Sequence, residues 1–114
     1  MEEKDISRIV AAAASEKKAR DIVIMDMREV MFSTDYFVIA SANTATQVRA
    51  IADNIEEKLD ELGIPFNHKE GYREGEWILL DYGDVVAHIF KQEAREYYDL
   101  ERLWGSAPLT PYED

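Results

Sequence analysis

The stretch from Glu70 to Phe90, EGYREGEWILLDYGDVVAHIF, brings together acidic, aromatic and imidazole side chains. Acids crowd around Trp77, and His88 interrupts an otherwise apolar run. Carboxylates pair with Arg and Lys side chains, and an indole supplies a large apolar contact, so this combination is typical of a surface that binds a basic protein. The acids are Glu70, Glu74, Glu76, Asp81 and Asp84.

A β-hairpin is needed to hold these side chains in place. Trp77 to Leu80 and Val85 to Phe90 consist almost entirely of β-branched, aliphatic or aromatic residues, and Asp81-Tyr82-Gly83-Asp84 supplies turn residues between them. Because side chains alternate along a strand, we expect Trp77, Leu79 and Asp81 to share one face near the middle of a sheet.

The composition predicts one globular domain. A chain of 114 residues with 46% apolar content is large enough to bury a core, and it has too much apolar material for disorder. We expect the domain to span residues 1–105 and a loosely ordered acidic tail to span 106–114. The start of the chain is not typical of a signal peptide and no apolar run is long enough to cross a bilayer, which favours a cytoplasmic protein.

Charge and cysteine content exclude several classes of function. The net charge of −11 opposes binding of nucleic acid through a broad basic surface, although a basic protein remains a plausible partner. An equally good explanation of the acidity is that it only keeps the protein soluble, without a role in binding a partner. The absence of cysteine excludes disulfides and thiolate sites, and two histidines leave little for zinc, so we expect no metal and no cofactor.

The first half of the chain predicts a helix over Lys4–Ala19 and strands over Asp21–Met27 and Asp35–Ser41. The bases of this helix favour a solvated face over a binding patch. A polar connection, Arg28 to Thr34, joins the two strands. Asp26 and Asp35 lie near strand ends, where turn formation or capping is favoured over metal binding.

A second helix is predicted to start after Thr44 and to end at Gly63. Thr44 and Gln47 have the spacing of a capping box, in which Thr44 accepts the N3 amide proton and Gln47 reaches back to the cap amide. An edge strand over Ile64–Tyr72 and short helices over Gln92–Tyr98 and Asp99–Trp104 complete the expectation. The inward-facing residues of the last helix should be Leu100, Leu103 and Trp104. This order indicates an α/β fold, with a mixed sheet of about five strands flanked by helices.

Several of these segments together resemble the ribosomal silencing factor family, also called RsfS or Iojap. The resemblance runs from about the first helix to Trp104. It rests on Glu-Gly, Trp and Asp-x-Gly-Asp-x-x-x-His followed by Leu-Glu-x-Leu-Trp. The segments are Thr34 to Ala40, Ile51 to Asp53, Glu70-Gly71, Trp77 to His88 and Leu100 to Trp104.

The resemblance implies a translational repressor. Such a protein binds the large ribosomal subunit at ribosomal large-subunit protein fourteen, on the face that meets the small subunit, and sterically prevents the small subunit from joining. It also implies a nucleotidyltransferase-like fold, recurrent dimers and no enzymatic activity. On motif grounds and strand alternation, the partner-binding residues are Glu70, Trp77, Leu79, Asp81, Asp84 and His88.

Structural roles compete with binding roles at two of these positions. Trp77 is as compatible with a core position as with a contact. For His88, a structural role, hydrogen-bonded within the fold, is favoured over a role in binding. Arg95 is expected to be a structural ion-pair partner.

Two other functions are alternatives to the repressor. A nucleotidyltransferase needs a Gly-Ser phosphate loop and acids one residue apart on a strand, and Ser41-Ala42-Asn43-Thr44 lacks the glycine. A dimeric scaffold, pairing through the Trp77 surface, is the other alternative.

Overall fold

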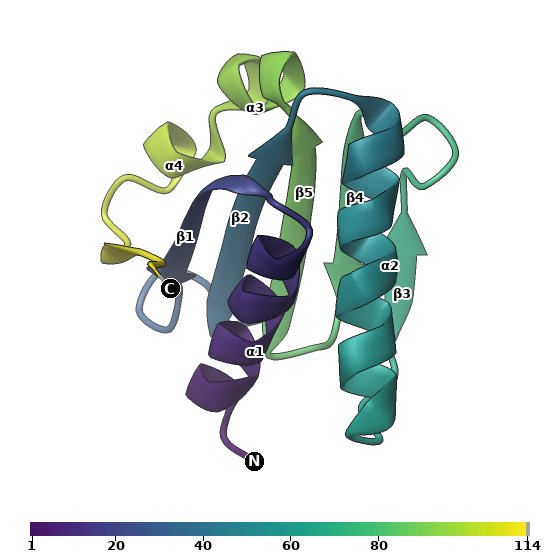
Figure 1. Ribbon diagram of the computed structural model, residues 1–114. Helices are drawn as coiled ribbons and strands as arrows, with labels where there is room; N and C mark the ends of the chain where they lie inside the picture. Colours follow the sequence, from purple (N-terminus) through teal and green to yellow (C-terminus); the bar gives the residue numbers. More distant parts are fainter. Residues whose placement is uncertain (114) are drawn as a thin grey trace.

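The computed structural model describes residues 1–113, within which six strands form one mixed sheet in the order β3-β4-β5-β2-β1-β6 (Figure 1). The parallel pair β2–β5 runs in register from Tyr36 opposite Val85 to Ala42 opposite Lys91, and the other neighbours pair antiparallel. The strands are β1 (Arg20–Asp26), β2 (Tyr36–Ala42), β3 (His68–Glu70), β4 (Trp77–Asp81), β5 (Val85–Lys91) and β6 (Leu109–Pro111).

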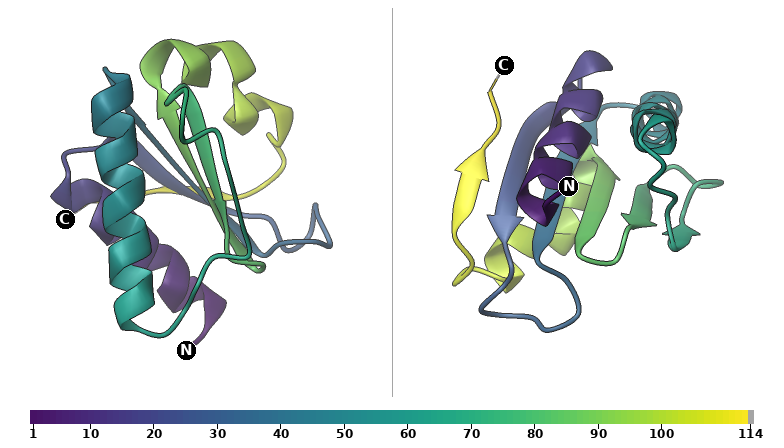
Figure 2. Two further views of the ribbon diagram at one scale, coloured as in Figure 1. Left: turned by 90° about the vertical axis from the view of Figure 1, so that its right-hand side faces the viewer. Right: turned by 90° about the horizontal axis from the view of Figure 1, so that it is seen from below.

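Two long helices cover one face of the sheet. Helices α1 (Glu3–Glu16) and α2 (Ala45–Glu61) lie side by side on this face, as Figures 1 and 2 show. Their apolar sides meet the sheet in a core that includes Val10, Ile51 and Ile55, all fully buried. Three of the four alanines of α1, Ala11, Ala13 and Ala14, are almost completely buried, because small side chains let this helix approach the sheet closely.

The opposite face of the sheet is only partly covered. Two short helices, α3 (Gln92–Tyr98) and α4 (Leu100–Leu103), lie over one end of it (Figure 2, left). Arg95 of α3 is buried there, donating to Glu101 at 3.0 Å and to the Ser41 hydroxyl at 3.0 Å, which confirms the predicted structural ion pair. The core under these helices includes Phe37, Ile39 and Phe90, while Trp77 and Leu79 pack at its margin.

The α/β class and the hairpin are confirmed, but the sheet has six strands in the described part of the chain rather than about five. The extra strand is β6, which pairs antiparallel with β1 and places Thr110 opposite Ile24. The segment expected to be a loose tail therefore contributes a sheet edge over Leu109–Pro111. Asp114, the last residue of that expected tail, lies outside the described residues.

At the start of α2, one of the two predicted capping-box hydrogen bonds is present. The Thr44 hydroxyl accepts a hydrogen bond from the Gln47 amide at 3.2 Å, which confirms the cap. The Gln47 side chain does not reach back to the cap amide; it donates to the carbonyl oxygens of Lys17 and Lys18, both at 3.3 Å. Gln47 thus ties the start of α2 to the end of α1. Gly63 follows the helix with a φ of +75°, as a C′ glycine should.

Helix α4 differs from the prediction in one side chain. Leu100 is buried and Trp104 is partly buried, whereas Leu103 is 67% exposed. A single helical turn can direct only part of its side chains toward the sheet, so Leu103 was wrongly assigned to the interior. No helix in residues 1–113 has the length and apolar character needed to cross a membrane.

Candidate protein-binding face

The hairpin presents alternate side chains to opposite sides of the sheet. Ile78 and Leu80 are fully buried beneath α1 and α2, while Trp77, Leu79 and Asp81 are only partly buried on the other face. The predicted alternation is therefore confirmed. We call the partly covered surface formed by Trp77, Leu79, Asp81 and His88 the Trp77 face.

Three of the predicted contact residues form a row across the sheet. Glu70 of β3 pairs with Leu79 of β4, and Leu79 pairs with His88 of β5. Residues directly opposite one another project to the same side, so the register brings these three together. Glu70 is exposed at the outer end of the row, where its carboxylate meets Nε2 of His68 at 2.6 Å.

Aromatic packing holds Trp77 in position. The indole stacks on Phe90 with ring centroids 4.9 Å apart and contacts Tyr98 of α3 at 4.8 Å. Its Nε1–H donates to Nδ1 of His88 at 3.1 Å. Trp77 is thus neither a core residue nor free in solvent, because one side is anchored and the other remains exposed.

His88 is buried and uncharged. Burial lowers the pKa of His88 to about 4, so the ring is neutral near pH 7. Since Nδ1 accepts the bond from Trp77, the ring proton resides on Nε2. Nε2 has no hydrogen-bond partner among the described residues. The prediction of a histidine bonded within the fold is confirmed for one nitrogen, and the other carries an unmet donor.

A depression of about 200 Å³ lies beside His88. The Thr34 hydroxyl, which is buried and also without a hydrogen-bond partner in residues 1–113, contributes to its lining. At the rim, Asp81 accepts the Gly83 amide through Oδ1 at 2.7 Å, so this carboxylate also shapes the turn. The remaining lining is largely apolar and includes Met31, Phe37, Leu79 and Val86.

Asp84 lies apart from the other predicted contact residues. Its carboxylate comes within 4.8 Å of those of Glu3 and Asp35, on the side of the sheet that α1 covers. Some loss of hydration and the neighbouring acids Asp35 and Glu3 raise the pKa of Asp84, although the residue is exposed. Three carboxylates could ligate a cation, but exposed acidic groups often gather without one, so no metal site is assigned.

Asp26, the other acid near a strand end, is paired with a cation. Arg28 donates to both of its carboxylate oxygens, at 2.9 and 2.7 Å, which lowers the pKa of Asp26. This ion pair accounts for Asp26 without a metal.

Two strongly exposed aromatic side chains, Phe32 and Tyr97, were not predicted from the sequence. Phe32 is fully exposed in the loop between β1 and β2, which the sequence predicts to be a polar connection, and Tyr97 is 82% exposed on α3. The available signal was the run Val30-Met31-Phe32, because apolar residues in a loop have no strand or helix pattern to explain them.

Comparison with known proteins identifies what this chain resembles. The family described as "Ribosomal silencing factor during starvation" matches residues 1–114. The Bacillus subtilis protein "Ribosomal silencing factor RsfS" is 47% identical over 110 residues, covering 96% of this chain and 93% of the relative. The protein of that name from Halalkalibacterium halodurans is 37% identical over 113 residues, covering 99% and 97%. A crystal structure of a Chromobacterium violaceum protein superposes with a TM-score of 0.90 at 33% identity, covering 100% of this chain and 95% of that one.

Proposed function

The chain belongs to the ribosomal silencing factor family, and from that premise we propose that it binds the large ribosomal subunit at ribosomal large-subunit protein fourteen and sterically blocks joining of the small subunit. The family is a regulatory one, with a ribosome-associated role in silencing translation. We place this action in the cytoplasm.

The observation that carries the proposal is the incomplete burial of the Trp77 face. An anchored indole and Leu79 are left partly exposed beside two buried polar atoms, Nε2 of His88 and Oγ1 of Thr34, that have no hydrogen-bond partner within residues 1–113. A buried unpaired donor costs about 1–3 kcal/mol, and a partner side chain that entered the depression and accepted from Nε2 would offset that cost. The Trp77 face is therefore suited to contact with a protein partner.

The acidic rim suits a basic partner. Asp81 and Glu70 flank the apolar centre, and the chain as a whole carries a net charge of −11. Opposite charge on the two proteins speeds association and makes it sensitive to salt. Asp84, which lies toward α1, would reach a partner only at the edge of the contact.

Steric blocking needs affinity and bulk but no chemical step. The domain measures 33 × 33 × 27 Å, so one bound copy would separate surfaces that must otherwise touch. A catalytic mechanism is not part of the proposal.

The test is a subunit-joining assay with purified large and small subunits. We expect the native chain to reduce the fraction of joined ribosomes in proportion to its occupancy of large subunits. Trp77→Ala should restore joining at the same concentration. Joining that proceeds equally with and without the native chain would refute the repressor function.

A second copy of the chain is the alternative occupant of the Trp77 face, because an apolar surface of this kind also serves a dimer. Sedimentation equilibrium distinguishes the two cases. If Trp77→Ala abolishes a dimer but leaves large-subunit binding intact, the face is a dimer interface and the proposed contact is wrong.

A further inference from the structure

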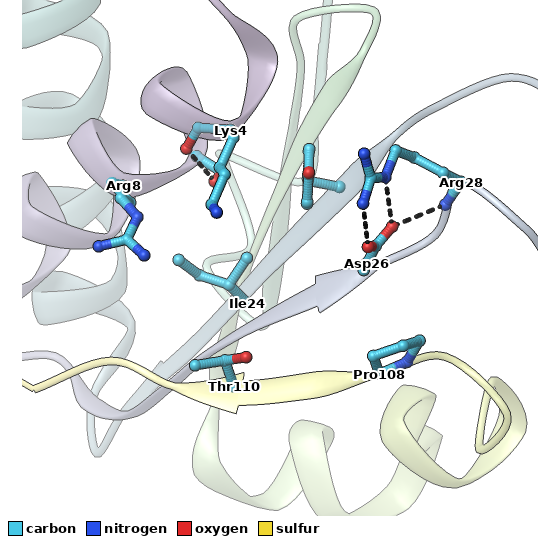
Figure 3. Close-up of a pocket in the computed structure, with 9 residues that line it drawn as sticks. Lys4, Arg8, Ile24, Asp26, Arg28, Pro108 and Thr110 are labelled. Carbon is cyan, nitrogen blue, oxygen red and sulfur yellow. Dashed lines mark hydrogen bonds and ion pairs between the residues drawn. The ribbon is translucent and has the colours of Figure 1, made fainter.

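A groove lined by cationic side chains lies on the side of the sheet that α1 covers. Lys4 and Arg8 are one helical turn apart on α1, and Arg28 follows β1 at the other end of the groove (Figure 3). Ile24 of β1 forms the floor, while Pro108 and Thr110 contribute the wall from the chain end and β6. The hollow measures about 270 Å³, and we call it the Lys4–Arg8 groove.

The groove carries excess positive charge. Asp26 neutralises Arg28, with the ion pair closing at 2.7 Å. Lys4 and Arg8 are exposed and have no salt-bridge partner in residues 1–113. The neighbouring acids Glu3 and Asp35 gather with Asp84 and do not line the hollow. Three cations therefore face one carboxylate.

The position of these two bases is not explained by the helix itself. Cations stabilise the C-terminal end of a helix, but Lys4 and Arg8 lie in its first two turns, where the macrodipole is positive. The first turn also carries Glu3 and Asp5, but neither of these acids lines the groove, so the charge that the groove itself presents comes from the two bases. Lys17 and Lys18, just beyond the other end of α1, are the bases that the dipole favours.

We propose that the Lys4–Arg8 groove binds a phosphodiester group of ribosomal RNA while the Trp77 face holds the protein partner. Lys and Arg are the side chains that most often contact backbone phosphates, and such contacts carry no sequence information. This inference rests on the proposed function, because it assumes that the chain is held on a ribosomal particle.

The overall charge determines when the contact forms. A net charge of −11 repels free RNA, so the groove cannot recruit RNA on its own. Once the Trp77 face is docked, the groove meets nearby RNA at a high effective concentration, and a weak local attraction adds to the affinity. The groove should therefore strengthen binding to the particle without affecting binding to the isolated protein.

Two matched double variants test this inference. Lys4→Gln/Arg8→Gln removes two positive charges from the groove, and Lys17→Gln/Lys18→Gln removes two from the opposite end of α1. The four side chains are exposed or partly exposed, and glutamine retains helix propensity, so both proteins should fold. Equilibrium binding is measured with purified large subunits and, separately, with RNA-free large-subunit protein fourteen, over a range of salt concentrations.

We expect the groove variant to bind large subunits about three- to tenfold more weakly at low salt and to lose about 1 to 2 units of the slope of log K against log salt. Its binding to isolated protein fourteen should equal that of the native chain. The control variant should match the native chain in both measurements. Inorganic phosphate at millimolar concentration should compete only weakly.

Three results would overturn the inference while leaving the proposed function intact. An equal loss in both variants would show a net-charge effect, and a loss on isolated protein fourteen would make the groove a protein contact. Strong competition by inorganic phosphate would make it a site for free phosphate. Failure of the native chain to bind large subunits at all would refute the proposed function, and this inference with it.

Discussion

The indole Nε1–H of Trp77 donates a hydrogen bond of 3.1 Å to Nδ1 of the buried His88. This bond joins β4 to β5 and fixes the direction in which the indole leans on the sheet. Because the ring is already held by His88 and by stacking on Phe90, little side-chain freedom remains to be lost on binding. Trp77, expected from the sequence to be either a core or a contact residue, is therefore anchored on a buried support, which preorganises it for the proposed contact.

Removal of the indole should weaken capture of large-subunit protein fourteen by about 1–2 kcal/mol or more, because a central aromatic residue dominates such interfaces. The change is Trp77→Ala, measured by calorimetry at low and moderate salt. Capture at native affinity would exclude Trp77 from the contact.

Removal of the Asp81 charge should weaken the same complex mainly at low salt. Asp81→Asn retains an oxygen that can accept the Gly83 amide, so the turn is preserved while the charge is lost. The association rate should fall severalfold, and the difference should shrink as salt rises. Glu57→Gln, on the outer surface of α2, removes an equal charge far from this face and should behave as the native chain.

The stability of the fold should fall with acid through His88. The pKa of His88 is lowered from 6.5 to about 4, so the unfolded chain binds a proton more readily than the folded one. The contribution of the neutral ring to the free energy of unfolding is fully present above pH 6.5 and is lost as the pH falls toward 4. This contribution is at most about 3 kcal/mol.

A comparison with His88→Gln isolates this contribution from the titrating acids. Urea unfolding at a series of pH values should show the stability gap between the native chain and the variant narrowing from pH 7 to pH 4. A gap that stays constant would contradict a buried neutral histidine.

Gly71 should tolerate no side chain. Its φ is +82°, and a Cβ at this position would overlap the carbonyl oxygen of Trp77. Gly71→Ala should therefore lower the free energy of unfolding by about 3 kcal/mol, from backbone strain and steric overlap together. Gly63→Ala is the matched control, since Gly63 has a similar φ of +75° but open space around it. It should lose only about 1 kcal/mol in the same denaturant titration.

Neutralising Asp84 should stabilise the protein at pH 7. Some loss of hydration and the carboxylates of Asp35 and Glu3 raise its pKa, so the folded state holds the proton more tightly than the unfolded state does. The ionised form is therefore penalised at neutral pH, and the penalty disappears as the pH falls below the ordinary value of 3.8.

Thermal unfolding of Asp84→Asn should show a midpoint higher by about 1–3 °C at pH 7 and no gain near pH 3. Asp60→Asn, at an exposed position of α2, serves as the control and should shift the midpoint less. A lower midpoint for Asp84→Asn would indicate that the acidic group is held by a favourable interaction.

The regular elements were predictable because their side-chain patterns are strong. Trp77 to Asp81 alternates between the two faces, and the stripe from Val48 to Leu59 follows a helical period, so both elements could be assigned from local sequence. The register that aligns Glu70, Leu79 and His88 depends on pairing between segments distant along the chain. Local pattern does not determine such pairing.

The errors have specific physical causes. Leu109–Pro111 is a strand of three residues containing a proline, so its strand character comes almost entirely from pairing with β1. Gln47 was assigned to a local cap, but tertiary packing offered it the carbonyls at the end of α1 instead. Phe32 was hidden in a loop that carries no periodic pattern. Each error reflects a contact made possible only by the folded arrangement.

The two outermost strands, β3 and β6, are each three residues long, and β6 contains Pro111, which has no amide hydrogen to donate. Because these edge strands are so short, they offer few unpaired backbone groups with which a strand of another molecule could form hydrogen bonds. The fold should consequently resist ordered self-association into fibres. Whatever docks on this molecule must be recognised by its side chains rather than added as a further strand.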